Sequence, residues 1–230
     1  MIGRRDDGFH DIETTIQSID LHDLLVVTRA ADTRLSTSGL SVPGGAGNTV
    51  LQAQAALEHA ARRTLPAHFH LHKRIPPGSG MGGASSDAAT ALRALKQLYR
   101  LDVDLEPVAA QVGADVTYFL RGGRARVTGR GEQVTSLAMQ PATYIVVWPE
   151  VELSTADVYR AWDEVKGEGP NELARAAQHV SRHVKDFAAT LGDRWQMTGS
   201  GSAFFQEAGR DEAPQIKVWS AVAHAVGPWS

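Results

Sequence analysis

The chain has 230 residues, of which 43% are hydrophobic and 21% charged, and its net charge at pH 7 is −3. These values are ordinary for a globular protein and argue against nucleic acid or a membrane surface as the main partner. The absence of cysteine excludes disulfide bonds and thiol catalysis, and no apolar run reaches the length of a membrane span. We therefore expect a cytoplasmic protein, monomeric or homodimeric, that binds neither nucleic acid nor a membrane.

The first third of the chain predicts strands, a loop and one helix. Residues 12–29 have the apolar centre of a strand, whereas 36–47 are rich in Gly, Ser and Pro and predict a loop. Asn48 is a good N-cap, and the apolar spacing after it predicts a helix to about Arg63. A further strand is expected at 67–73.

Three histidines alternate along this last strand, so they share one face. They are His68, His70 and His72. A solvated strand face is the interpretation that we favour over a metal site, because no carboxylate joins the imidazoles. We therefore assign no metal site to these histidines.

The remaining elements mix helices and strands without strict alternation, which predicts an α+β fold. Helices are expected after the glycine-rich stretch at 78–87 and at 104–112, 154–165 and 171–191, and strands at 124–128 and 142–148. Glycine turns are expected at 113–116 and at 197–203. The boundary between two domains is placed near 138–141, ahead of the apolar strand.

The most informative stretch is Gly-Ser-Gly-Met-Gly-Gly-Ala-Ser-Ser-Asp at 78–87, which opens directly into a helical pattern. Its glycines allow the backbone to approach a ligand closely, and the first N–H groups of the helix attract an anion. Ser85 and Ser86 can cap the helix or reach a phosphate or a magnesium ion. The alternative is a plain loop with an N-cap, but the density of glycines favours a phosphate site.

Two familiar phosphate motifs do not fit this stretch. No Gly-Lys-Ser/Thr closes it, so it is not a Walker A loop. Gly78, Gly80 and Gly83 match the dinucleotide-binding spacing, but no early βαβ unit with a ribose-binding acid accompanies them.

Asp115 is the candidate catalytic carboxylate. It stands in a turn, Gly113-Ala114-Asp115-Val116, where small neighbours would let it point into a cleft. Its alternative role is that of a turn or N-cap aspartate.

Three separated motifs resemble the signature regions of the GHMP small-molecule kinases: the glycine loop, Gly113-Ala114-Asp115, and Thr198-Gly199-Ser200-Gly201. Residues 3–14 are similar to the G-R-R-x-D-G-Y-H-x-L-x-T stretch of the kinases that act on 4-diphosphocytidyl-2-C-methyl-D-erythritol in the non-mevalonate isoprenoid pathway. Asn48 and Asn171 begin segments that are similar to two further motifs of those kinases.

The resemblance implies a two-domain α+β architecture, with a ribosomal-protein-like fold in residues 1–139 and a shortened ferredoxin-like fold in 140–230. It implies ATP and Mg²⁺ as cofactors and a cytidine-diphospho alcohol, phosphorylated at its 2-hydroxyl, as substrate. Asp115 would accept the proton of that hydroxyl. The residues implied for ATP are Pro77, Gly78, Ser79, Gly80, Met81, Gly82, Gly83, Ala84, Ser85, Ser86 and Asp87. Those implied for the substrate are Phe9, His10, Lys73, Thr198, Gly199 and Ser200.

The sequence departs from the pattern of these kinases at its start. They begin with a strand of the type P-A-K-x-N-L, whose lysine belongs to the active site, and the sequence in hand begins beyond it. We therefore expect impaired catalysis. Two alternatives remain: an inactive nucleotide-binding protein of the same fold, and a kinase of another small alcohol such as mevalonate or homoserine.

Overall fold

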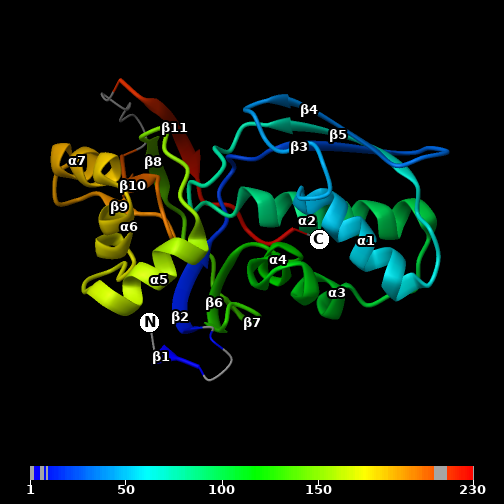
Figure 1. The fold of residues 1–230 in the computed structure, drawn as a ribbon, viewed down its shortest axis with the longest axis horizontal. Helices are drawn as coiled ribbons and strands as arrows, with labels where there is room; N and C mark the ends of the chain where they lie inside the picture. The colour runs from blue at the N-terminus through cyan, green and yellow to red at the C-terminus, as the bar shows by residue number, and fades with distance from the viewer. Residues whose placement is uncertain (1–2, 6–7, 9, 210–216, 230) are drawn as a thin grey trace.

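The computed structural model describes residues 3–5, 8, 10–209 and 217–229. Its ribbon divides into two lobes, with a sheet and several helices in each and one more sheet between them (Figure 1). The expected α+β class is thereby visible as layers of helices on sheets. No helix in these residues is both long and apolar enough to cross a bilayer.

The first sheet lies in the lobe that carries the glycine loop. Its strand order is β3 (Leu24–Arg29), β5 (Ala67–Lys73), β4 (Arg34–Gly39), with β5 antiparallel to β3 and parallel to β4. Helices α1 (Thr49–Ala61), α2 (Gly83–Tyr99) and α3 (Leu105–Val112) form a layer on one side of this sheet (Figure 1).

Side-chain alternation along β5 explains this layer. Ala67, Phe69 and Leu71 are buried, and they join Leu57 of α1 and Leu92 of α2 in one hydrophobic core. Asn48 begins α1 as expected, because its side chain accepts a hydrogen bond from Val50 N. The buried face of β5 therefore fixes the sheet against the helices.

The opposite face of β5 carries the three histidines. Parallel pairing places Ser36 and Ser38 of β4 beside them, and their hydroxyls hydrogen-bond His70 Nδ1 and His72 Nδ1, each at 3.0 Å. The predicted shared face of His68, His70 and His72 is confirmed by this register.

The second sheet is wholly antiparallel, in the order β1 (Gly3–Arg4), β2 (His10–Gln17), β6 (Arg124–Gly129), β7 (Gln133–Leu137). Helix α4 (Ala114–Phe119) precedes β6 and packs Tyr118 into the small core between helix and sheet. The Tyr118 hydroxyl hydrogen-bonds Ser18 at 2.7 Å and Gly123 O at 2.7 Å, which joins the ends of β2, α4 and β6.

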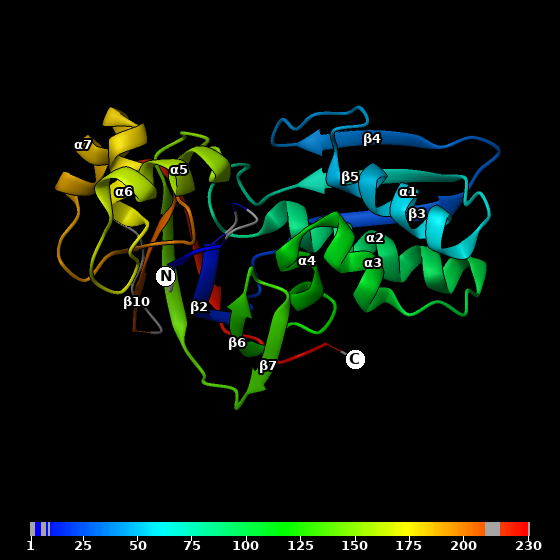
Figure 2. The ribbon, with the colours of Figure 1, turned by 60° about the horizontal axis from the view of Figure 1, so that its bottom comes forward.

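The third sheet belongs to the other lobe and is also antiparallel. Its order is β11 (Trp219–His224), β8 (Thr143–Trp148), β10 (Phe204–Glu207), β9 (Gln196–Met197). Helices α5 (Thr155–Val165), α6 (Ala174–Val180) and α7 (Arg182–Thr190) lie together beside it (Figure 2). The chain after β11 returns to the first lobe through isolated bridges between Ile19 and Ala225 and between Gly122 and Pro228.

Several sequence expectations are corrected by these elements. The segment 12–29 is two strands in different sheets, and 36–39 belongs to β4 rather than to a loop. The helix expected over 171–191 is interrupted at Ser181, which has extended backbone and accepts a hydrogen bond from Val184 N, so it caps a new helix. A serine can offer the backbone this local partner in place of helix continuation.

The expected division into domains falls in the connection between β7 and β8. We keep residues 1–139 and 140–230 as the proposed domains, with the returning segment after β11 as the part that joins the second to the first.

Candidate active site

The glycine loop at 78–87 is held by the glycine turn at 197–203. Gly78 O accepts hydrogen bonds from the N–H groups of Leu153 and Ser202, both at 3.1 Å. Ser79 O accepts one from Thr198 Oγ1 at 2.6 Å and one from Ala203 N at 3.1 Å. Residues 119 and 124 positions apart in the chain thus form a single substructure.

Two glycines of the loop have to be glycines. Gly80 and Gly82 have φ of +75° and +72°, a region that L side chains rarely adopt. A Cβ at Gly80 would lie 2.7 Å from Gly201 N, and one at Gly82 would lie 2.7 Å from the ring of Phe119. The loop therefore approaches both the third turn and helix α4 closely.

The N-terminus of α2 is open to an anion. Its N-cap is Gly82, so no side chain accepts the first N–H groups of the helix. Two hydroxyls near it are turned to carbonyl oxygens instead: Ser86 Oγ donates to Gly83 O at 2.8 Å, and Ser79 Oγ donates to Pro76 O at 2.6 Å. The positive end of the helix dipole and unpaired amides make this a suitable phosphate site.

Asp115 lies in the first turn of α4, and not in the open turn that its glycine neighbour suggests. It shares a helix face with Phe119, four residues later, which contacts Gly82. The Asp115 side chain is accessible to solvent, yet the surrounding protein desolvates it and raises the pKa of its carboxyl above the ordinary value. Both properties fit a carboxylate inside a cleft.

The β6–β7 hairpin borders Asp115 from another side. A Cβ at Gly131 would be 3.2 Å from Asp115 Oδ1 and 3.0 Å from Ala114 Cβ. The absence of a side chain at Gly131 therefore leaves room for the carboxylate.

His10 is buried between β2 and helix α5. Its Nε2 shares a hydrogen bond with Asp163 Oδ1 at 2.8 Å. Its ring centroid is 5.2 Å from that of Tyr159 and 5.5 Å from that of Trp162, which meets it edge-on. These contacts fix the orientation of the imidazole.

Tyr159 lies near both Asp115 and His10. Burial, followed by the negative charge of Asp115, raises the pKa of its hydroxyl to about 12. Tyr159 therefore lies within electrostatic reach of Asp115 while its ring lies beside His10, so the structure brings Asp115 and His10 to one region between the lobes.

The remaining substrate candidates differ in their positions. The Asn171 amide donates to Gly199 O at 2.8 Å, and Ser200 Oγ is 3.0 Å from Thr155 Oγ1 at the start of α5. Of these three residues, Thr198 hydrogen-bonds the glycine loop directly through Ser79 O. The contact of Thr198, Gly199 and Ser200 with a substrate stays a prediction. Phe9 lies outside the described residues.

Lys73 is placed differently from what the sequence predicts. We expected it to line the substrate pocket, whereas its side chain is 3% exposed and its ammonium lies beneath α2. There it contacts Asp87, which belongs to the stretch expected to bind ATP and is itself buried. Both side chains are enclosed below the loop.

Sequence reasoning missed several residues that shape the site. Tyr159 and Asp163 stand on a plain amphipathic helix. Neither Phe119 nor Asp23, whose carboxylate pairs with Lys73, was assigned a role from the sequence. Only the pairing of distant elements identifies them, because each one acts through a neighbour more than 20 residues away.

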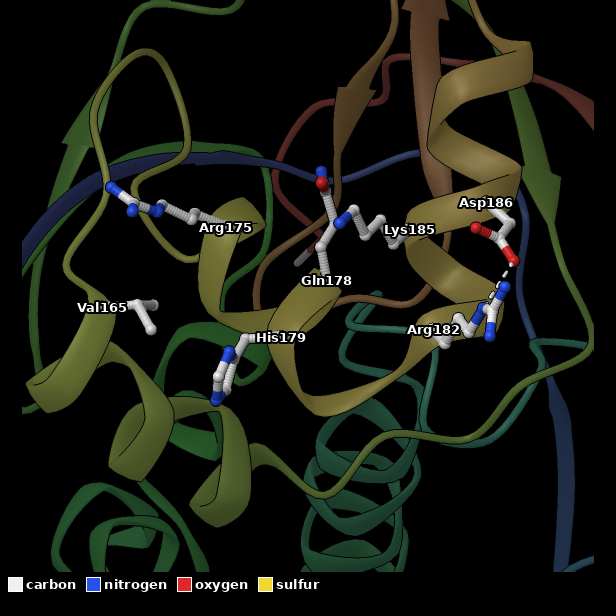
Figure 3. A pocket seen from close by; sticks show the side chains of 7 residues that line it. All are labelled: Val165, Arg175, Gln178, His179, Arg182, Lys185 and Asp186. Atoms are coloured by element: carbon white, nitrogen blue, oxygen red, sulfur yellow. Dashed lines mark ion pairs between the residues drawn. The ribbon is translucent and has the colours of Figure 1, made fainter.

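A separate hollow of about 700 Å³ lies among α5, α6 and α7 (Figure 3). It is lined by Val165, Arg175, Gln178, His179, Arg182, Lys185 and Asp186. None of the residues that the sequence predicts for catalysis or binding lines it. This hollow is therefore distinct from the region of Asp115 and His10.

Comparison with known proteins gives a consistent result. Residues 48–123 match the N-terminal domain of the GHMP kinases. The 4-diphosphocytidyl-2-C-methyl-D-erythritol kinase of Delftia acidovorans is 36% identical over 88% of this chain and 80% of its own length. That of an Azoarcus species is 34% identical over 99% of this chain and 90% of its own length.

A solved 4-(cytidine 5'-diphospho)-2C-methyl-D-erythritol kinase has the same fold, with a TM-score of 0.76 and 31% identity, and covers 97% of this chain and 94% of that one. Solved homoserine kinase from Cytophaga hutchinsonii, at 20% identity and a TM-score of 0.62, shares the fold alone.

Proposed function

The chain belongs to the family of 4-diphosphocytidyl-2-C-methyl-D-erythritol kinases, and from this we propose that it transfers the γ-phosphoryl group of ATP to the 2-hydroxyl of 4-(cytidine 5'-diphospho)-2-C-methyl-D-erythritol. The reaction belongs to the non-mevalonate route to isoprenoid precursors. The observation that carries the proposal is the position of helix α4. Phe119 contacts Gly82 of the glycine loop, and Asp115 lies one turn earlier on the same face of this helix.

The phosphates of ATP are assigned to the glycine loop and the first turn of α2. Backbone N–H groups of residues 83–85 face no side-chain cap, so they remain free to donate to phosphate oxygens. Residues 77–86 supply this cradle, whereas Asp87, the last residue of the stretch expected to bind ATP, is buried below it. The turn at 198–203 keeps the cradle in place through its hydrogen bonds to Gly78 and Ser79.

Magnesium fits the oxygen-rich start of α2. Mg²⁺ prefers hard oxygen ligands and commonly uses few protein groups together with phosphates. The hydroxyls of Ser85 and Ser86 lie in the first turns of the helix, and they are the residues that would hold the ion. When bound, Mg²⁺ supplies charge neutralisation at the phosphates.

Asp115 is proposed to accept the proton from the substrate hydroxyl. The hydroxyl oxygen then forms a bond to the γ-phosphorus as the bond to the leaving ADP oxygen breaks. Phosphoryl transfer depends mainly on positioning and electrostatic stabilisation, so the fixed spacing between Asp115 and the phosphate loop is the main contribution of the fold.

The cytidine side of the substrate is assigned to the region of His10. Tyr159 offers an aromatic surface beside this histidine, and Asp163 holds the imidazole in one orientation. Thr198, Gly199 and Ser200, in the turn that holds the glycine loop, are also assigned to the substrate. Phe9 stays a sequence-based prediction. Lys73 is buried below the loop and is not assigned to the substrate.

Product analysis tests the assignment. The protein is incubated with Mg·ATP and, separately, with the cytidine-diphospho alcohol, mevalonate and homoserine, and the products are identified by mass. We expect a mass increase of one phosphoryl group with the cytidine compound alone. Equal turnover of mevalonate would refute the cytidine assignment, and ATP binding without any product would favour the inactive nucleotide-binding alternative.

Two further properties remain predictions. We expect the protein in the cytoplasm, which cell fractionation checks. We also expect a monomer or a homodimer, which light scattering of the purified protein distinguishes.

A further inference from the structure

Three ionisable side chains are buried together beneath the glycine loop. Lys73 Nζ donates a hydrogen bond to Asp87 Oδ2 at 2.8 Å and another to Asp23 Oδ2. The exposed fractions of the Lys73, Asp23 and Asp87 side chains are 3%, 3% and 6%. We name these residues the lysine triad. Such groups are costly to bury, so each must keep its partner.

The lysine triad joins three elements. Lys73 is the last residue of β5, Asp87 lies in α2, and Asp23 comes directly before β3. The ammonium also fills the space below the first residue of α2, because a Cβ at Gly83 would lie 2.9 Å from Lys73 Nζ. The hydrogen bond between Lys73 and Asp87 therefore joins the two ends of the segment 74–86.

Asp23 holds the entrance of the same segment. Its Oδ1 accepts hydrogen bonds from the N–H groups of Arg74 at 2.6 Å and of Ile75 at 2.9 Å. One carboxylate thus binds the ammonium of Lys73 and also fixes the backbone of the next two residues. Asp23 therefore fixes the backbone where the chain leaves β5 and enters the glycine loop.

The energetics suggest a role beyond stability. A cation below a helix N-terminus faces the positive end of the dipole, and apolar side chains of similar volume often replace a buried ion cluster without loss of stability. A loop rich in glycine, in contrast, loses much conformational entropy when it is ordered. If the link between Lys73 and Asp87 already orders the loop, ligand binding loses less conformational entropy and is therefore tighter.

We propose that Lys73 and Asp23 are positioning residues that hold the glycine loop and the first turn of α2 in the phosphate-binding conformation. Lys73 acts through Asp87 and Asp23, without contact to nucleotide or substrate. The inference rests on the proposed function, since that function assigns the ATP phosphates to this loop.

The decisive variant removes the charges in a balanced way. Lys73→Met/Asp87→Leu replaces the ammonium and one carboxylate by apolar groups and leaves Asp23 with its two backbone donors. Lys96→Met is the matched control, because this lysine lies in the last turn of the same helix and donates to Val103 O. Asp23→Asn is a milder variant that keeps the shape of the side chain and removes its charge.

Two measurements follow the loop in folded protein, as verified by the thermal unfolding midpoint. The first is hydrogen–deuterium exchange of peptides covering 74–88 without nucleotide. The second is the affinity for Mg·ATP by calorimetry, together with KM for ATP and kcat. We expect faster exchange and at least tenfold weaker Mg·ATP binding in the double variant, a smaller change of the same sign in Asp23→Asn, and none in Lys96→Met. Because the triad acts on loop order, KM for ATP should change more than kcat at saturation.

Wild-type exchange and wild-type affinity in the folded double variant would overturn the proposal. If that variant does not fold, unchanged exchange and affinity in Asp23→Asn would overturn it equally. A wild-type protein that fails to bind Mg·ATP would contradict the proposed function, whereas the exchange measurement needs no nucleotide and tests the lysine triad by itself.

Discussion

The phenyl ring of Phe119 lies against Gly82, so close that a Cβ on the glycine would be 2.7 Å from two ring atoms. Phe119 is the last residue of α4, and Asp115 precedes it by four positions on the same helix face. Four residues of helix correspond to about 6 Å along the axis. The contact therefore sets the spacing between the candidate phosphate site and the candidate carboxylate.

Gly82→Val is expected to abolish Mg·ATP binding. Valine is unfavourable at φ +72°, and its side chain would also displace the ring of Phe119. Calorimetry of the folded variant measures the effect. The control is Gly44→Val, because no atom lies within 4 Å of a Cβ at that surface position. Retained affinity in Gly82→Val would show that the phosphates bind elsewhere.

Asp115→Asn is expected to lower kcat by about 10²–10⁴-fold, which is the usual contribution of a positioned proton acceptor. The affinity for Mg·ATP should stay within about twofold of wild type, because the glycine loop is unchanged. Steady-state rates with saturating substrates give kcat. A variant with wild-type kcat would remove Asp115 from the mechanism.

The pH dependence of the wild-type rate follows from the same carboxylate. Only its ionised form accepts a proton, and desolvation raises its pKa above the ordinary value of 3.8. Activity should therefore fall, as the pH is lowered, at a higher pH than for an exposed aspartate. The dependence of kcat/KM on pH between 4 and 8 measures this loss of activity. A midpoint at the ordinary pKa of aspartate would mean that Asp115 is fully hydrated in the working enzyme.

Local signals predicted most of the elements around the site. Asn48 as N-cap and the alternation along 67–73 correctly gave α1 and β5, because both depend on neighbours within a few residues. The glycine density at 78–87 likewise indicated the loop before α2. The resemblance to GHMP kinases supplied the fold.

Long-range contacts were not predictable in the same way. The burial of Lys73 depends on Asp23, 50 positions away, and the position of His10 depends on Asp163, 153 positions away. No local pattern distinguishes a lysine that will line a pocket from one that will be enclosed by two carboxylates.

Asp163→Ala is expected to raise KM for the cytidine substrate about tenfold, which corresponds to the loss of one hydrogen bond to a charged group. The variant removes the partner of His10 Nε2, so the imidazole loses its fixed orientation. KM for ATP should change little. Asp157→Ala on the same helix is the control, since Asp157 pairs with the exposed Arg160. A parallel rise in both KM values would indicate general damage and contradict a specific role of His10.

Stability should depend on pH through Asp87. Burial is the main cause that raises the pKa of its carboxyl from 3.8 to about 7, against the opposing effect of Lys73. The folded protein therefore holds this proton more tightly than the unfolded chain does. The corresponding contribution to the free energy of unfolding is complete below pH 4 and is lost as the pH rises to about 7.

An asparagine side chain does not titrate, so Asp87→Asn should lose less stability than wild type as the pH rises. The difference in the free energy of unfolding is on the order of a few kcal/mol at most. Urea unfolding of wild type and variant at pH 5 and pH 8 measures the difference, and subtraction removes the contribution of other carboxylates. Asp186→Asn is the control, because this exposed residue pairs with Arg182 at 3.5 Å on the surface of α7. If wild type and Asp87→Asn lose the same stability between the two pH values, Asp87 is already ionised within the lysine triad, and the triad carries a net negative charge throughout this range.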